Sequence, residues 1–240
     1  MNNTESRTIA EIVADDYKTA DIFKKYGIDF CCGGKKSLQK TCEQKQININ
    51  DVISDLEKIK NSDEEISNYK EWDLDKLSQH IISKHHKYVS VNIPIITEYS
   101  EKVAKVHGHY YTEVVEINNL FKEIANELLS HMQKEEMILF PYINSLADAK
   151  RNNTTIPSPP FGTILNPINM MEMEHENAGD IIKKIQELSN NFTPPKEACN
   201  TYRVLYAKLD EFEKDLFLHI HLENNILFPK AVVLEKQLLE

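Results

Sequence analysis

The pattern His-x-x-x-Glu-x-x-Ile-Leu-Phe-Pro occurs twice in this chain, beginning at His131 and again at His219. In an α-helix, residues four positions apart lie on one face, about one turn from each other. Each copy therefore directs an imidazole and a carboxylate to one place, and the carboxylates are those of Glu135 and Glu223. A single copy could be an ordinary surface pair, but two copies with the same apolar, proline-terminated continuation predict metal ligands on two helices.

The rest of the chain is typical of a helical protein. Only 6 of the 240 residues are glycine, and the alternation that predicts strands is scarce. A proline-rich loop is expected from Arg151 to Pro167. Helical segments are predicted at 73–92, 93–107, 112–147, 168–189 and 197–238. Four principal helices with one long crossover predict an all-α four-helix bundle.

The first sixty or so residues carry shorter apolar stripes, which predict a small helical domain. Thr8 is a candidate N-cap for the first stripe, and Gly27 is a natural end for the second. An unusual turn with the sequence Cys31-Cys32-Gly33-Gly34 follows. The predicted organisation is a small helical domain at 1–62, a polar linker at 63–72 and the bundle at 73–240.

Three further histidines precede the motifs or lie between them. Singly, each would more often be an ordinary polar residue, and the case for them is that they complete a ligand set. Five imidazoles with two carboxylates suit iron or a neighbouring transition metal, whereas calcium and magnesium prefer oxygen donors. The predicted metal ligands are His86, His107, His131, Glu135, His175, His219 and Glu223.

A ligand count tests the idea of a pair of metal ions bridged by both glutamates. If Glu135 and Glu223 both bridge, the seven side chains supply nine bonds, and an oxo or hydroxo bridge adds two. Two six-coordinate metals need about twelve bonds. One position would therefore stay open to a small molecule such as oxygen or nitric oxide.

The same ligand set makes a prediction about the backbone. His86 and His107 are 21 residues apart, which is about 31 Å along an unbroken helix. For both to reach one metal cluster, the chain must double back between them, near Pro94 or at Tyr99-Ser100.

The remaining histidines are not expected to be ligands. His85 and His221 point about 100° and 200° away from the neighbouring predicted ligands on a helix. His80 and His109 are expected to lie beside the site or at the surface.

The four cysteines are few and irregularly spaced, so a disulfide framework is not expected. The adjacent pair Cys31 and Cys32 does not match the Cys-x-x-Cys pattern of zinc or redox sites. A structural role in a tight turn and a functional role, in binding iron, accepting a nitrosyl group or contacting a client, stay equally open from the residues alone. Cys42 and Cys199 are expected to be structural or incidental.

Two other metal-site classes fit poorly. A ferritin-like site needs two Glu-x-x-His pairs, and only the pair that ends in His175 fits. A zinc protease needs His-Glu-x-x-His, but Gly179 stands where the second histidine should be.

Charge and hydropathy limit the partners and the location. The formal net charge of -10 disfavours nucleic acid and anionic membranes as partners. The first residues lack the apolar core of a signal peptide, and no stretch approaches the ~18 apolar residues of a membrane span. A cytoplasmic location is therefore expected.

The two motifs, the histidines between them and the Cys31-Cys32-Gly33-Gly34 turn resemble the Repair of Iron Centers family. The resemblance covers nearly the whole chain and extends to Val106-His107, Glu174-His175-Glu176 and the stretch from Pro194 to Cys199. It implies a hemerythrin-like di-iron bundle behind a short N-terminal domain, with all seven predicted residues as ligands. It also implies that Glu174 influences the surroundings of the metals, and it favours a functional role for Cys31 and Cys32.

The resemblance further implies repair of iron–sulfur clusters damaged by nitric oxide or oxidants, with iron donation as the favoured mechanism. Damaged iron–sulfur proteins would be the partners, and a homodimer is allowed. The alternatives are a nitric oxide reductase and a sensor that binds oxygen or nitric oxide at the same di-iron site. The extra N-terminal domain favours repair, because a simple gas carrier does not need it. Whether the protein is an enzyme is left open.

Overall fold

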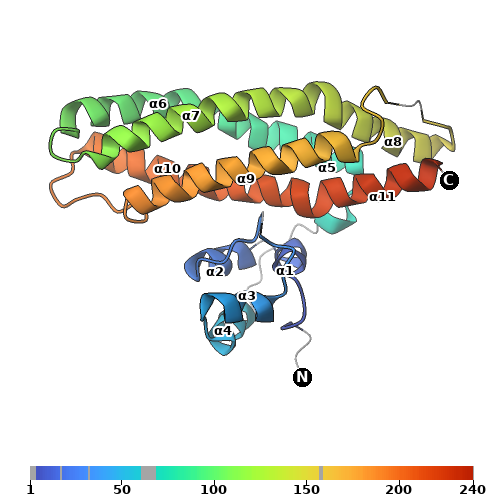
Figure 1. The fold of residues 1–240 in the computed structure, drawn as a ribbon, viewed down its shortest axis with the longest axis horizontal. Coiled ribbons are helices and arrows are strands. Elements are labelled where there is room, and N and C mark those ends of the chain that lie inside the picture. The colour runs from blue at the N-terminus through green and yellow to red at the C-terminus, as the bar shows by residue number, and fades with distance from the viewer. Residues whose placement is uncertain (1–3, 17, 32, 61–68, 157–158, 240) are drawn as a thin grey trace. The chain divides into compact units, whose positions relative to one another are not determined.

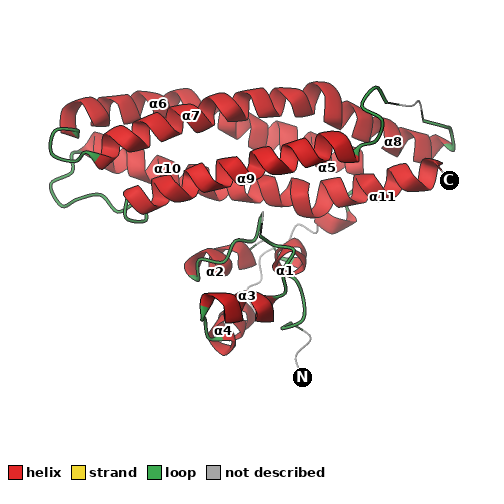
Figure 2. Ribbon diagram, viewed as in Figure 1, coloured by secondary structure: helices red, strands yellow, loops and turns green. Residues whose placement is uncertain are grey.

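The computed structural model describes residues 4–16, 18–31, 33–60, 69–156 and 159–239, which are drawn in colour in Figure 1. In these ranges helices are joined by loops and turns, and strand pairing is limited to one isolated bridge between Thr8 and Ser37 (Figure 2). The predicted all-α fold is confirmed. None of the described helices combines the length and the apolar character that a membrane span requires.

The chain forms two compact units, each made of separate segments. The first, here called the bundle unit, comprises Gln79–Tyr142 and Ser158–Leu216. The second, here called the terminal unit, comprises Met1–Ser78, Ile143–Pro157 and Phe217–Glu240. Because helices α5, α8 and α10 run through the boundaries, several helices contribute residues to both units.

Four helical rods make up the bundle unit. They are η2 (Ile81–His86) continued by α6 (Lys87–His107), α7 (Glu113–Lys134) continued by η3 (Glu135–Leu139), α9 (Leu165–Leu188), and most of α10 (Asn200–Leu222). Helix α7 packs against both α6 and α9, and the rings of Phe121 in α7 and Phe212 in α10 meet edge to face at 5.4 Å. The predicted hemerythrin-like four-helix bundle is therefore present.

The apolar spacing of each rod determines which face is buried. In α7 the buried residues Ile117, Phe121, Ile124 and Leu128 alternate at steps of four and three, which keeps them on one helix face. The next step along this stripe reaches His131, which is also buried. A polar ligand is thus carried into the interior by the same periodicity that builds the apolar core.

The terminal unit contains the short N-terminal helices α1 (Ile9–Asp15), α2 (Thr19–Lys25), α3 (Leu38–Lys45) and α4 (Ile49–Lys60). It also holds η1 (Tyr69–Glu71), most of α5 (Leu74–His80), most of α8 (Phe140–Asn152), η4 (Glu223–Leu227) and α11 (Phe228–Leu239). Thr8 caps α1, since its side chain accepts a bond from the Glu11 N–H and the Glu11 carboxylate accepts one from the Thr8 N–H. Gly27 follows α2 with φ of 61°, a left-handed conformation that glycine adopts without strain. Both sequence predictions of helix ends are confirmed.

Both repeated motifs contain a π-helical turn, at η3 and at η4. Proline has no N–H, and its ring clashes with the carbonyl four residues earlier in a regular α-helix. In each motif the residue before the proline bonds five residues back instead: Phe140 N–H to the Glu135 carbonyl, and Phe228 N–H to the Glu223 carbonyl. The wider turn lets each helix continue through its proline.

The prediction that the chain doubles back between His86 and His107 is wrong. Helix α6 runs without a break from Lys87 to His107, with Pro94 inside it. A proline in a helix interior costs about 3 kcal/mol. Four apolar side chains of α6 are buried in the bundle unit, and their burial offsets this cost. They are Val89, Ile93, Ile96 and Val103.

Candidate metal centre

Each motif delivers its histidine and glutamate as predicted, one helical turn apart and buried. His131 Nε2 lies 3.3 Å from Glu135 Oε2, and His219 Nε2 lies 3.0 Å from Glu223 Oε1. Both carboxylates are 0% exposed. The glutamate is the first residue of the π turn in both copies. The two halves of the repeat thus have the same local structure as well as the same sequence.

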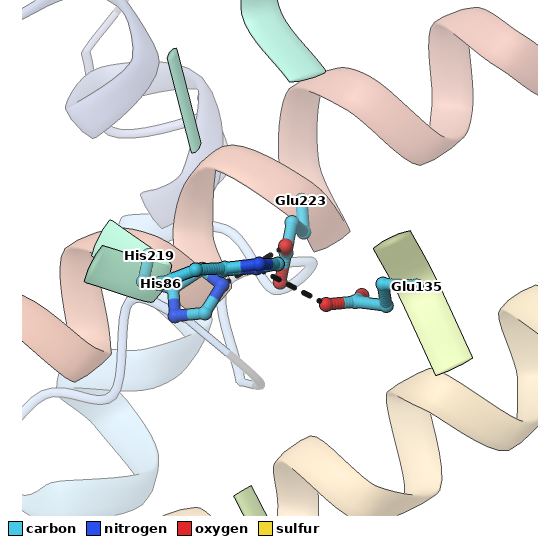
Figure 3. A group of neighbouring side chains, drawn as sticks. All are labelled: His86, Glu135, His219 and Glu223. Atoms are coloured by element: carbon cyan, nitrogen blue, oxygen red, sulfur yellow. Dashed lines mark hydrogen bonds and ion pairs between the residues drawn. The ribbon is translucent and has the colours of Figure 1, made fainter. Parts of the chain in front are cut away.

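Six of the seven predicted ligands fall into two overlapping groups of donor atoms. The donors of His86, Glu135, His219 and Glu223 all lie within 4.8 Å of one another (Figure 3). So do those of His131, Glu135, His175 and Glu223. The two groups share both glutamates, and each adds two histidines of its own. All six side chains are buried.

Within the bundle unit, Glu135 faces histidines of both groups. Its Oε2 atom lies 3.4 Å from His86 Nε2 and 3.3 Å from His131 Nε2. The Nε2 atoms of His131 and His175 are 2.9 Å apart. Several electron-pair donors and two buried carboxylate charges therefore meet in a small volume. Such a cluster is costly without a compensating positive charge, and its mixture of nitrogen and oxygen donors suits a transition-metal cation.

Two carboxylates outside the donor groups orient two of the imidazoles. His86 Nδ1 donates to Glu136 Oε1 at 2.7 Å, and His131 Nδ1 donates to Glu174 Oε2 at 2.8 Å. With Nδ1 protonated, Nε2 presents its lone pair toward the donor group, which is the arrangement typical of metal-bound histidine. The ring of Phe140, from the first motif, stacks on His86 at 5.7 Å and fixes it further.

Glu174 was predicted to influence the surroundings of the metals, and its position fits that role. The hydrogen bond from His131 and the ion pair with Lys134 lower the pKa of Glu174 to about 2, against the opposing effect of partial burial. Glu136 was missed by sequence reasoning. Its adjacency to Glu135 was the available signal, but a residue one position along a helix points about 100° away.

His107 does not join either donor group. It ends α6, with Nε2 at 3.2 Å from Cys199 Sγ and its ring centroid 5.4 Å from that of Tyr202. His86 and His107 are three heptads apart, so they share the inward face of one continuous helix but lie at its opposite ends. His107 therefore faces the interior, as a ligand would, but it lies too far along the helix from His86 to reach the same metal cluster.

The turn that contains Cys31 packs within the terminal unit against the second motif. Asn225 donates to the backbone carbonyls of Phe30 and Cys31, at 3.4 and 3.1 Å. Cys31 is buried, and its thiol donates to Asp29 Oδ1 at 3.3 Å. Cys32 lies outside the described residues.

Two of the other histidines contribute to packing and hydrogen bonding. His221 packs against Phe30 in the terminal unit, and burial lowers its pKa to about 4, so the neutral imidazole is favoured there. His85 is buried in the bundle unit and contacts Asp215 Oδ1 at 3.0 Å. Neither residue belongs to a donor group.

A cavity of about 440 Å³ in the bundle unit reaches one side of the donor cluster. His131, His175, Lys134 and Glu174 are among its lining residues. The cavity therefore lies beside the histidine pair of the second donor group.

Two segments of the chain match known protein families. Residues 77–231 match the family described as "Hemerythrin HHE cation binding domain". Residues 5–60 match ScdA_N, described as "Domain of Unknown function (DUF542)".

Several relatives align along nearly their whole length. The iron-sulfur cluster repair protein ScdA of Staphylococcus haemolyticus is 32% identical over 95% of this chain and 98% of its own. The iron-sulfur cluster repair protein YtfE of Pectobacterium atrosepticum is 34% identical over 94% of this chain and 96% of its own. A probable iron-sulfur cluster repair protein of Haemophilus influenzae is 35% identical over 93% of this chain and 96% of its own. With both domains matched and relatives of this similarity along nearly the full chain, the protein belongs to the Repair of Iron Centers family of hemerythrin-like proteins.

Proposed function

We propose that this protein repairs iron–sulfur clusters damaged by nitrosative or oxidative stress, and that it does so by donating iron from the six-residue donor cluster. The observation that carries the proposal is the pair of donor groups that share Glu135 and Glu223. The relatives named for iron–sulfur cluster repair align with both the cluster and the N-terminal domain, which supports the choice of process. Bound iron would supply the ions that a damaged cluster has lost.

The donor groups suggest how two irons would be held. One iron would take His86 and His219, the other His131 and His175, and each glutamate would give one oxygen to each iron. Six side chains then supply eight bonds, one fewer histidine bond than the sequence predicted. With an oxo or hydroxo bridge, each iron would have five of about six bonds. One open position on each iron would leave room for nitric oxide, oxygen or an outgoing ligand.

The cavity beside His131 and His175 suggests which iron leaves first. An ion held by these two histidines could exchange with solvent or a client through this opening. Lys134 would otherwise repel a cation here, but its charge is offset by the ion pair with Glu174. We therefore propose that the iron held by this pair is the labile one.

The test is anaerobic mixing with a nitric-oxide-damaged iron–sulfur enzyme. The protein is loaded with isotopically labelled iron, and recovered activity and transferred label are measured together. We expect both to rise in parallel, and His175→Ala to abolish both. His109→Ala, which removes an exposed histidine outside both donor groups, serves as the matched control and should behave as wild type.

Two results would contradict the proposal. Recovery of enzyme activity without transfer of labelled iron would exclude iron donation as the repair mechanism. Repeated turnover of nitric oxide with the iron retained would favour the alternative, a nitric oxide reductase or gas sensor built on the same cluster.

Damaged iron–sulfur proteins are the proposed clients, in the cytoplasm, with nitric oxide or oxygen as small ligands. Three expectations from the sequence stay predictions. They are the handling of iron or nitrosyl groups by Cys31 and Cys32, the homodimer, and the domain boundaries at 1–62, 63–72 and 73–240.

A further inference from the structure

One cysteine and one histidine form a contact in the bundle unit, outside the donor cluster. His107 is the last residue of α6, and Cys199 directly precedes the first residue of α10. The distance from His107 Nε2 to Cys199 Sγ is 3.2 Å, within the range of a hydrogen bond that involves sulfur. A thiol beside an imidazole nitrogen is the arrangement in which a base can take the proton of an attacking sulfur.

Cys199 differs in accessibility from the other described cysteines. Cys31 and Cys42 are buried, whereas Cys199 is exposed. Burial raises the pKa of the Cys42 thiol, which makes that residue less reactive still. Among the cysteines that the structure describes, Cys199 is thus the one that a dissolved reagent can reach while a base is in contact with it.

Cys199 lies at the N-terminal end of the long helix α10. Its carbonyl accepts the N–H of Arg203 at 3.1 Å, which begins the hydrogen bonding of the long helix α10. The N-terminus of a helix carries a partial positive charge. The Arg203 guanidinium is held at the same end by bonds to the carbonyls of Ala198 and Lys196, at 3.2 and 2.8 Å. Electropositive, exposed sites of this kind are where reactive cysteines occur.

The imidazole is held in place by its neighbours. Its ring packs against the buried ring of Tyr202, one turn into α10. The carbonyl of His107 accepts the N–H of Tyr111 at 2.9 Å, which fixes the end of α6. Because base and thiol are both positioned before any reagent arrives, little ordering is needed for them to act together.

We propose that Cys199 is a thiol-modification site, that His107 is its base, and that low-molecular-weight disulfides are the reagents it takes. Cys199 Sγ attacks one sulfur of the disulfide and forms a new S–S bond, while the original S–S bond breaks. Its proton passes to His107 Nε2 and then to the departing thiolate. Cys199 is oxidised to a mixed disulfide, and half of the small disulfide leaves as the reduced thiol. The inference is independent of iron, because neither residue belongs to a donor group.

The test uses the full-length protein and a chromogenic aromatic disulfide, with release of the coloured thiolate as the readout. Peptide mass mapping at early times identifies the cysteine that has reacted. We expect the first modified peptide to contain Cys199, and Cys199→Ser to remove the fast phase. His107→Asn should slow that phase on the order of tenfold, which is below the 10²-fold or more typical of a general base, because an exposed thiol also loses its proton to water. His109→Asn, a change of the same kind at an exposed histidine two residues on, should leave the rate unchanged.

Three results would overturn the proposal: first modification at another cysteine, an unchanged rate in His107→Asn, or equal slowing in His107→Asn and His109→Asn. Folding of the variant is checked by its helical circular dichroism and by continued protection of the buried Cys42. If His107→Asn fails this check, His107→Gln is measured in its place, and the mapping on the wild-type protein still decides between Cys199 and the other cysteines.

Discussion

The hydrogen bond between Glu174 and His131 allows a prediction with a stated magnitude. Glu174→Gln keeps the shape of the side chain but removes the negative charge of the carboxylate whose Oε2 lies 2.8 Å from His131 Nδ1. A hydrogen bond to a charged group contributes about 1.5–3 kcal/mol. The Glu174 side chain is 35% exposed, so solvent screening places its effect near the lower figure. About 1.4 kcal/mol is a tenfold change in affinity, so the iron bound by His131 should be held about tenfold more weakly.

The assay is anaerobic competition for iron between the protein and a chromophoric chelator. Wild-type protein should release its two irons in separate phases, and Glu174→Gln should shift one phase about tenfold while leaving the other in place. Glu176→Gln removes the same charge from an exposed position on the same helix and is the matched control. Equal weakening in both variants would mean that only net charge matters. No weakening in Glu174→Gln would mean that the carboxylate does not support the ligand.

Three further predictions concern the cluster and the terminal unit. Glu223→Leu removes a carboxylate common to both donor groups and should reduce bound iron by at least one ion per chain, measured by elemental analysis; unchanged content would refute bridging. Gly34→Ala would place a Cβ 2.4 Å from the Phe30 carbonyl oxygen and should lower the free energy of unfolding by about 1–3 kcal/mol in urea titration, whereas an unchanged midpoint would contradict the close approach. The hydrogen bond from Lys25, followed by those from Lys58 and Tyr26, lowers the pKa of Asp55 from its ordinary 3.8. The ionised Asp55 therefore stabilises the folded protein fully above pH 3.8, and this stabilisation is lost as the pH falls through the lower pKa of the folded state. Asp55→Asn should make acid unfolding less steep, and an identical acid transition would refute the contribution of Asp55.

The motif was sufficient to predict most of the candidate site. A four-residue spacing determines which side chains share a helix face, and that local rule placed His131 with Glu135 and His219 with Glu223 correctly. His86 and His175 were found because the donor types form a chemically sensible set. Each of these residues continues a buried apolar stripe, so their direction followed from periodicity.

The sequence predictions were wrong or incomplete where the structure depends on the packing of helices against one another rather than on residue spacing within one helix. His107 has the correct phase on α6 to face inward, and the sequence alone does not show that the helix continues past Pro94. Burial of the apolar face of α6 decides that question, and it depends on the other helices of the bundle. The partnership of His86 with Glu136 was also missed, because it joins residues 50 positions apart on different helices.

The π turns have a consequence for insertions and deletions. A π turn holds one more residue than an α-helical turn, and in each motif a proline follows it. Deleting one residue from 136–138 would allow an ordinary α-helical turn there and retain the ligands, but Pro141 would then lie in a regular α-helix, where its ring clashes with the carbonyl four residues earlier. A single-codon deletion in this stretch should therefore disrupt the protein more than most substitutions at the same positions, and the length of the Glu-to-Pro interval is as much a part of the motif as the residues that define it.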